Sequence, residues 1–209
     1  MLIDTHCHLD FPDFDAERDE LVARAKGAGV AQMVTISTRV KKFQQIVDIA
    51  EKYENVFCSV GTHPANADEG LDITAEDLVA LTAHPKVVAI GEAGLDYHYE
   101  PENAEAQKTG LRRHIDAARR TGLPLVIHSR DADDDMAAIL TEETEAGAFP
   151  FILHCFSSGR GLAETGVALG GYVSFSGILT FKNSQDIRDI AADIPMDRLL
   201  VETDAPYLA

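Results

Sequence analysis

Short runs of apolar, often β-branched residues alternate with amphipathic stretches along the whole chain. This alternation is typical of repeated βα units, which assemble around a parallel sheet. Several of the runs have no polar face, which indicates a sheet that is covered on both sides. The runs predict eight strands, at Leu2–Thr5, Gln32–Ser37, Val56–Val60, Val87–Gly91, Leu125–His128, Phe151–His154, Tyr172–Phe175 and Leu199–Glu202.

The amphipathic stretches predict helices, because their apolar residues recur at intervals of three to four. Gly122 and Pro124 mark the end of the longest one, as expected of a helix stop before a strand. The helices are expected at Asp15–Ala28, Lys41–Tyr53, Ala75–Ala83, Glu102–Thr121, Asp134–Ala146 and Ser184–Ala192. The sequence therefore predicts an α/β protein with a TIM-like (β/α)8 barrel.

No linker rich in Pro, Gly or Ser divides the chain, so we expect a single domain over residues 1–209. The final C-terminal helix of such a barrel is missing from the predicted elements. We therefore expect an uncovered apolar strip on the first and eighth strands, which a second copy of the chain or a further C-terminal segment would cover.

Residues of metal-ligand type follow several of these strands directly. His6 and His8 come after the first strand, and the two-residue period of an extended chain sends both imidazoles to one side. The other candidates in corresponding positions are Glu92, His128, His154 and Asp204. The carboxyl ends of barrel strands form one face, where active sites lie. We expect these six side chains to meet there.

Four imidazoles and two carboxylates match the nitrogen and oxygen ligands of zinc, manganese and similar ions. Buried polar and charged groups need partners, so a ring of them favours a bound cation; a purely structural polar network is the alternative. Six groups exceed the three protein ligands that one catalytic zinc usually takes. We therefore predict two divalent cations (Mg2+, Mn2+ or Zn2+), with Glu92 bridging them.

Six sequence motifs together resemble the TatD family of metal-dependent deoxyribonucleases, within the wider amidohydrolase-like barrels, and the resemblance covers residues 1 to 209. As they stand here, they are Ile3-Asp4-Thr5-His6-Cys7-His8-Leu9-Asp10, Gly61-Thr62-His63-Pro64, Gly91-Glu92-Ala93-Gly94-Leu95-Asp96, His128-Ser129-Arg130-Asp131-Ala132, His154-Cys155-Phe156-Ser157 and Glu202-Thr203-Asp204-Ala205-Pro206-Tyr207.

The resemblance implies that the six candidate residues are the metal ligands. It also implies that Asp204 accepts a proton from the attacking water, whose pKa the metals lower. The expected substrate is DNA, trimmed as single strands from an end. Hydrolysis of an amide, ester or lactone, including deacylation, is the alternative on the same barrel. A non-catalytic barrel that metal stabilises is a third possibility. Members of the family usually continue for some tens of residues past Ala209, which puts the activity of this chain in question.

Three further residues complete the predicted site. Glu202 lies two positions before Asp204, so we count it with Asp204 and Glu92 as catalytic; it would orient a ligand or accept a proton, the alternative being an interior carboxylate paired with a histidine. His63 and Arg130 are predicted to bind a substrate phosphate, because both follow strands and Arg can donate two hydrogen bonds to phosphate. A salt bridge to Asp131 or Asp96 is the alternative for Arg130.

The remaining histidines receive simpler interpretations. His84 and His114 are expected to be solvated. His98 belongs to an aromatic segment, Asp96-Tyr97-His98-Tyr99, which either stacks on a base or packs within its loop.

The net charge of −17 disfavours nucleic acid, because non-specific binding normally relies on basic residues that neutralise phosphates. Few lysines and many aspartates suggest that the protein works at high salt, where screening weakens this repulsion; stability and activity that are indifferent to molar salt would contradict this hypothesis. The N-terminus has no signal-peptide pattern, and no apolar run reaches membrane-spanning length. Three distant cysteines form no CxxC pair. We therefore predict a cytoplasmic protein with no membrane partner.

Overall fold

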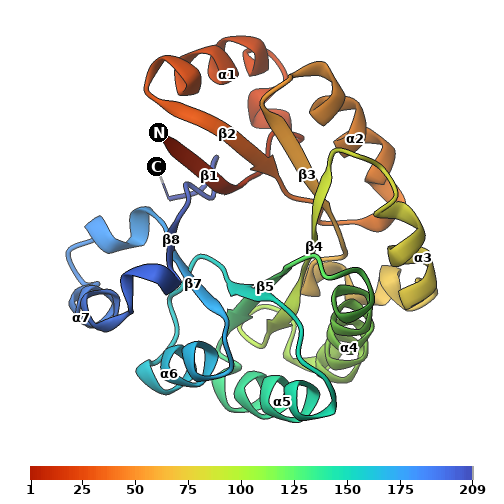
Figure 1. Ribbon diagram of the computed structural model, residues 1–209, viewed down its shortest axis with the longest axis vertical. Coiled ribbons are helices and arrows are strands. Elements are labelled where there is room, and N and C mark those ends of the chain that lie inside the picture. Colours follow the sequence, from red (N-terminus) through yellow and green to blue (C-terminus); the bar gives the residue numbers. More distant parts are fainter. Residues whose placement is uncertain (209) are drawn as a thin grey trace.

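The computed structural model of the protein describes residues 1–208 and contains eight parallel strands in one sheet, paired in sequence order (Figure 1). The strands are β1 (Leu2–Cys7), β2 (Val30–Thr35), β3 (Val56–Val60), β4 (Val87–Asp96), β5 (Leu125–Arg130), β6 (Phe151–Leu153), β7 (Tyr172–Phe175) and β8 (Leu199–Val201). The helices around them are α1 (Arg18–Gly27), α2 (Phe43–Lys52), α3 (Ala75–Leu81), α4 (Ala104–Thr121), α5 (Asp133–Ala146), α6 (Arg160–Ala168) and α7 (Gln185–Asp193). The predicted (β/α)8 architecture is confirmed.

The sheet curves until its first and last strands meet, so the barrel is nearly closed (Figure 1). The segment after β8 makes the closing bonds. The backbone N–H of His8 donates to the carbonyl of Ala205 at 2.8 Å, and that of Asp204 donates to the carbonyl of His6 at 2.8 Å. This closure lies at the carboxyl ends of the strands and brings β1 together with the segment after β8.

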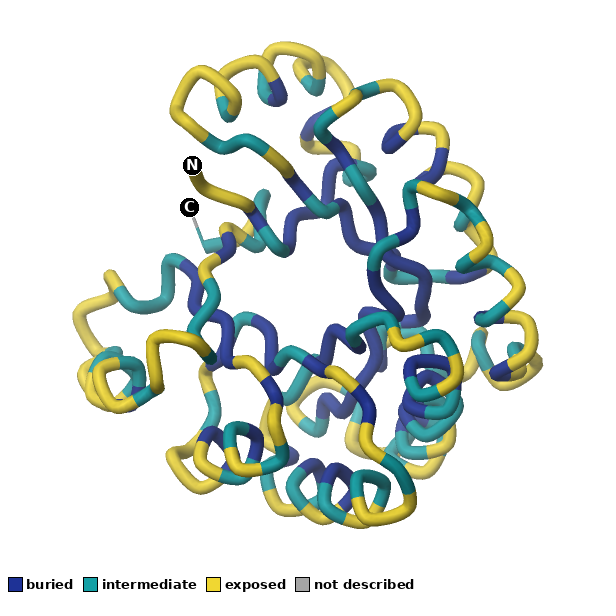
Figure 2. The backbone as a smooth tube through the Cα atoms, in the orientation of Figure 1, coloured by how far each residue is buried: buried dark blue, intermediate teal, exposed yellow. Residues whose placement is uncertain are grey.

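The core lies mainly between the strands and the helices that surround them (Figure 2). Alternation along β5 explains this arrangement. Ile127 packs in the large apolar cluster, whereas Val126 belongs to a separate small cluster with Ile36 and Ala89. His128 lies two residues after Val126 and therefore on the same face of β5. The strand thus buries apolar side chains on both faces before it presents a functional one.

Two differences from the predicted elements concern glycine. Strand β4 continues five residues past Gly91, because Gly94 pairs with His128 where any Cβ atom would overlap the carbonyl of that residue. Helix α6 lies outside the predicted set. It contains Gly161 and Gly166, which lower helix propensity, yet a Cβ on Gly166 would lie 2.7 Å from Leu153. Close packing on β6 therefore favours glycine over a better helix former.

Exposed apolar residues are present on the first and eighth strands, as expected. Leu2, Ile3 and Val201 are 55%, 43% and 48% exposed, and no helix follows β8 within residues 1–208. What covers these residues, a second copy or a further segment, stays a prediction.

Among residues 1–208, no helix combines the length and the apolar character needed to cross a membrane.

Candidate metal centre

All six predicted ligands meet at the carboxyl ends of the strands. His6 lies in β1 and His8 directly follows it, while Glu92 lies in β4 and His128 in β5. The remaining two, His154 and Asp204, follow β6 and β8. Their nitrogen and oxygen atoms form two adjoining groups of donors, which share Glu92. The juxtaposition expected from the strand ends is therefore present.

The first group of donors comes from the closing edge of the barrel. The Nε2 atoms of His6 and His8 are 3.2 Å apart, and Asp204 Oδ1 lies 3.5 and 3.4 Å from them. Glu92 Oε2 completes the group at 3.5 Å from His6 Nε2. Asp204 has a left-handed backbone, with φ of +58°, which an aspartate tolerates better than most residues. These four side chains direct donor atoms toward a common point.

The second group gathers around the other oxygen of the same carboxylate. Glu92 Oε1 lies 2.8 Å from His154 Nε2, 3.1 Å from His128 Nδ1 and 3.5 Å from His63 Nε2. The two oxygens of Glu92 therefore face two different sets of imidazoles. Because Glu92 is only 2% exposed, it lies at the centre of the cluster.

The charges of these groups are strongly coupled. Burial opposes ionisation of Glu92, but His154, His63 and His128 overcome it and hold its pKa well below the usual range. Burial likewise opposes the charged form of His154, yet Glu92 and Glu202 raise its pKa well above normal. At His63 burial dominates and lowers the pKa to about 4. His63 is therefore neutral near pH 7, and because its Nδ1 accepts the N–H of Ala65, its proton lies on Nε2, on the side of Glu92.

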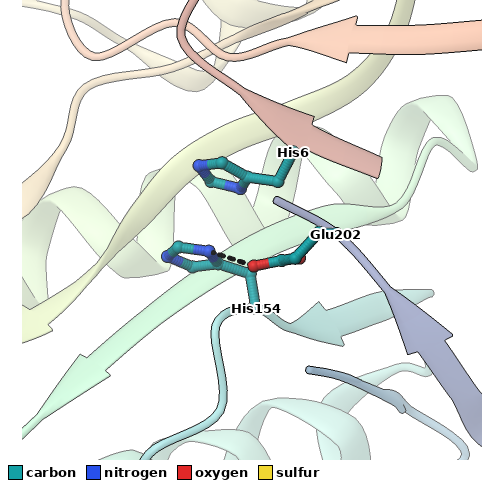
Figure 3. A group of neighbouring side chains, drawn as sticks. All are labelled: His6, His154 and Glu202. Atoms are coloured by element: carbon teal, nitrogen blue, oxygen red, sulfur yellow. Dashed lines mark hydrogen bonds and ion pairs between the residues drawn. The ribbon is translucent and has the colours of Figure 1, made fainter. Parts of the chain in front are cut away.

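Two carboxylates contact the outer side of the imidazoles. Glu202 Oε1 lies 3.1 Å from His154 Nδ1 and accepts the backbone N–H of Cys155 at 2.7 Å. His6 stacks on His154 with ring centroids 3.9 Å apart, and Figure 3 shows His6 above the His154 ring and Glu202 beside that ring. Glu202 thus contacts a histidine that faces Glu92, which fits both the orienting role and the paired interior carboxylate considered for it.

Asp96 has the same relation to His128, which the sequence motifs alone did not indicate. Its Oδ2 lies 3.0 Å from His128 Nε2, and its Oδ1 accepts the backbone N–H groups of His98 and Tyr99 at 3.0 Å each. Burial opposes ionisation of Asp96, but these bonds lower its pKa to about 2. A carboxylate that accepts the outer N–H of a ligand histidine fixes its tautomer and ring orientation.

The donor set fits a bound cation. Glu92, Asp96 and Glu202 are at least 92% buried and Asp204 is half-buried, so these four negative charges need a counter-charge, which is either protons on imidazoles such as His154 or a bound cation. Buried charge of one sign is costly unless a counter-charge is bound. Two nitrogens facing each other at 3.2 Å, as in His6 and His8, are also the arrangement that a shared electrophile stabilises. The side chains of these two residues have buried Nδ1 atoms without a hydrogen-bond partner.

The other predicted site residues have distinct positions. His63 lies inside the cluster, with Nδ1 accepting the N–H of Ala65 at 3.0 Å and Nε2 directed at Glu92. Arg130 is exposed at the end of β5 and stacks on Tyr99, with its guanidinium carbon 4.8 Å from the ring centroid. Neither alternative salt bridge forms, because Asp96 pairs with His128 and Asp131 pairs with His98 at 2.9 Å.

The prediction that His114 is solvated was wrong. This side chain is 4% exposed; its Nε2 accepts the N–H of Thr62 at 3.1 Å, and Nδ1 donates to the carbonyl of Gly110 at 2.7 Å. The signal was its position three residues after Leu111 and beside Ile115, on the apolar face of α4. His84, in contrast, lies near the surface and contacts Glu51 at 3.1 Å.

Comparison with known proteins places this cluster in a family. Residues 3–209 match the family described as TatD related DNase. The chain is 42% identical to YcfH of Escherichia coli strain K12 over all of this chain and 78% of that protein, and 39% identical to YabD of Bacillus subtilis over all of this chain and 81% of that protein. Both relatives are described as uncharacterized metal-dependent hydrolases.

Solved structures agree with this grouping. The crystal structure of the TatD homologue YjjV from Escherichia coli K12 superposes with a TM-score of 0.90 at 34% identity, over 99% of this chain and 80% of that one. Organophosphorus hydrolase of Deinococcus radiodurans, at 13% identity and a TM-score of 0.67, shares the fold alone. The chain therefore belongs to the TatD family of metal-dependent hydrolases.

Proposed function

We propose that this hydrolase is a deoxyribonuclease, which cleaves phosphodiester bonds of single-stranded DNA from an end with two divalent cations. The proposal rests on one observation: the two carboxylate oxygens of Glu92 face separate sets of imidazoles. Paired cations a few ångströms apart suit displacement at phosphorus, because they stabilise the attacking and the leaving oxygen together.

The residues that would hold the cations follow from the two groups. His6, His8 and Asp204 would hold one, and His128 and His154 the other, with Glu92 shared between them. Two divalent ions would also match the four negative charges of Glu92, Asp96, Glu202 and Asp204. Mg2+, Mn2+ and Zn2+ are the candidates, and when bound they would lower the pKa of water and polarise the phosphate.

The chain supplies the proton acceptor and the orienting contacts. Burial raises the pKa of Asp204, but a hydrogen bond from His8 and the nearby His154 and His6 lower it overall, so Asp204 is ionised at neutral pH and able to take a proton from water. Asp96 and Glu202 hold His128 and His154 in place. Arg130 projects at the same face with a guanidinium available for a phosphate.

One observation favours the second candidate, hydrolysis of an amide, ester or lactone at carbon. The net charge of −17 opposes approach of a polyanion, whereas a small neutral substrate meets no such barrier. A deacylase on the same metal centre would use Asp204 in the same way.

The test is cleavage of end-labelled single-stranded DNA with Mn2+ or Mg2+, alongside ester and amide substrates. His128→Ala and Asp204→Asn should each lower the DNA rate by about 10²-fold or more, because a donor to the cations or a general base is lost. His84→Ala is the matched control for histidine removal, since His84 contacts only the surface residues of its own region.

The outcomes separate the candidates. Cleavage that survives both substitutions would indicate a contaminating nuclease and contradict the proposal. Turnover of esters or amides without DNA cleavage would support the second candidate. A protein that binds metal and gains stability from it, but turns over none of these substrates, would support the non-catalytic barrel.

A further inference from the structure

An exposed aromatic ring lies beside the metal centre, on the loop between β4 and α4. Tyr99 is 63% exposed, more than any other aromatic side chain among residues 1–208. Arg130 stacks on the ring at 4.8 Å, and its Nη1 contacts the Tyr99 hydroxyl at 3.4 Å. His98 approaches the ring edge-on, with centroids 4.7 Å apart. The two side chains Tyr99 and Arg130, the stacked pair, form a flat surface with a cation at the mouth of the barrel.

The backbone of the loop that carries Tyr99 is held by Asp96, which also contacts His128. Asp96 accepts the backbone N–H of Tyr99 with one oxygen and contacts His128 with the other. Gln107, only 1% exposed, bonds the backbone of Asp96 on both sides and the carbonyl of Glu100. The backbone at Tyr99 is therefore held next to the predicted ligand His128.

Arg130 is available for a ligand in a way that no other arginine is. Within residues 1–208, the other ten arginines each pair with a carboxylate or donate to a backbone carbonyl, whereas the Arg130 side chain makes its one hydrogen bond to the Tyr99 hydroxyl. The chain has nearly twice as many acidic as basic residues, yet the guanidinium of Arg130 pairs with no carboxylate. It can therefore bind an anionic group of a ligand. Its planar group is also suited to a phosphate.

We propose that the stacked pair binds a nucleobase of the substrate, with Tyr99 as the stacking surface and Arg130 as the contact to the adjoining phosphate. The proposal rests on the function proposed above and adds what the enzyme recognises. Aromatic rings combined with a nearby cation are how proteins bind single strands without reading their sequence, because every base has a flat face. The net charge of −17 opposes binding of a polyanion, and stacking supplies affinity for a strand without further basic residues.

The test compares two labelled oligonucleotides of equal length and charge, oligo-dT and a strand of abasic tetrahydrofuran units. Binding to the full chain is measured by fluorescence anisotropy in the presence of Ca2+. A gel of each sample verifies that the strand has not been cleaved. The wild-type protein should bind oligo-dT more tightly. Tyr99→Ala should weaken oligo-dT binding about 5- to 100-fold and leave the abasic strand within roughly twofold, as expected for the loss of one stacked base.

Four further variants make the comparison specific. Tyr99→Phe should keep the preference for oligo-dT, and Tyr99→Leu should lose it as Tyr99→Ala does. Arg130→Ala should weaken both strands. Tyr172→Ala is the matched control, because Arg198 also covers that ring, at 5.2 Å, but Tyr172 begins β7 at the opposite end of the barrel. It should bind both strands like the wild type.

Equal weakening of both strands by Tyr99→Ala, or no weakening of oligo-dT, would overturn the proposal. Failure of the proposed function gives a different result: a Tyr99-dependent preference for oligo-dT in a protein that cleaves no DNA. DNA cleavage with the same kcat/KM on both strands, in wild type and Tyr99→Ala alike, would reject the base contact and leave the nuclease intact.

Discussion

The substitution Asp96→Asn should weaken one of the two predicted cation sites without unfolding the barrel. With a cation bound, Asp96 Oδ2 accepts a hydrogen bond from the Nε2–H group of His128, which leaves the lone pair of Nδ1 free on the side of Glu92. An asparagine has a single acceptor, and the N–H groups of His98 and Tyr99 already occupy it. Its NH2 group would then face His128 Nε2, where two donors cannot pair.

The imidazole can relieve this conflict only by moving its proton to Nδ1. That nitrogen would then point a proton, rather than a lone pair, toward the cation. Loss of such a supporting partner typically costs about 10- to 100-fold in metal affinity, or roughly 1.4 to 2.7 kcal/mol. The site formed by His6, His8 and Asp204 does not contact Asp96 and should keep its affinity.

Calorimetric titration of the metal-free protein with Zn2+ or Mn2+ measures this directly. The expected result is one weakened and one unchanged binding event. Asp131→Asn is the matched control, because Asp131 pairs with the exposed His98 and contacts no predicted ligand. Two unchanged events in a correctly folded Asp96→Asn protein would refute the tautomer argument, and so would an equal loss in the control.

Three further predictions concern stability. Gly61→Ala should destabilise the fold by about 1–3 kcal/mol or more, since its Cβ would overlap the backbone of Gly91. Gly110→Ala is the control: no atom lies within 4 Å of its Cβ, so it should be neutral or slightly stabilising. Chemical denaturation that ranks the two variants in the opposite order would contradict this prediction. The pKa of buried His114 is about 4, below the 6.5 of the unfolded chain, so the unfolded state binds more protons between these values. Wild-type stability should therefore rise between pH 4 and 6.5, by up to about 3 kcal/mol from this residue. In melts of the metal-free proteins, the stability of His114→Gln should depend less steeply on pH than that of the wild type. The same pH dependence in both proteins would contradict this prediction. Removal of metal by EDTA should lower the melting temperature, because the folded state then loses the free energy of cation binding, and a melt unaffected by chelation would argue against a cation at this centre.

The sequence was sufficient to predict the barrel and the meeting of the six candidate ligands, because both depend on a local pattern. Each of His6, Glu92, His128 and His154 lies at or just beyond the end of an apolar run, and parallel strands place such ends together. The position of His63 inside the cluster required more than this. Its Nε2 lies close to Glu92 because β3 and β4 approach at Gly61 and Gly91, a contact between distant segments.

Asp96 and His114 show why the rest was not predictable. Asp96 contacts His128 because β4 runs past Gly94 and pairs in register with β5, whereas the apolar pattern ends at Gly91. His114 is buried because the N–H of Thr62 offers it a partner 52 residues away. Local patterns indicate which face of an element is apolar, but a polar side chain on that face becomes stable only through a partner that the three-dimensional structure supplies.

The bonds between the segment after β8 and β1 give the centre a mechanical role. His6 and His8 come from the first residues of the chain, and Asp204 comes from nearly the last. A cation bound by all three would link β1 to the segment after β8, which is the seam of the barrel. Separating these two segments would then require release of the cation. Amide hydrogens along this seam should then exchange with solvent more slowly as metal concentration rises, while those of α4 and α5 on the far side follow global unfolding.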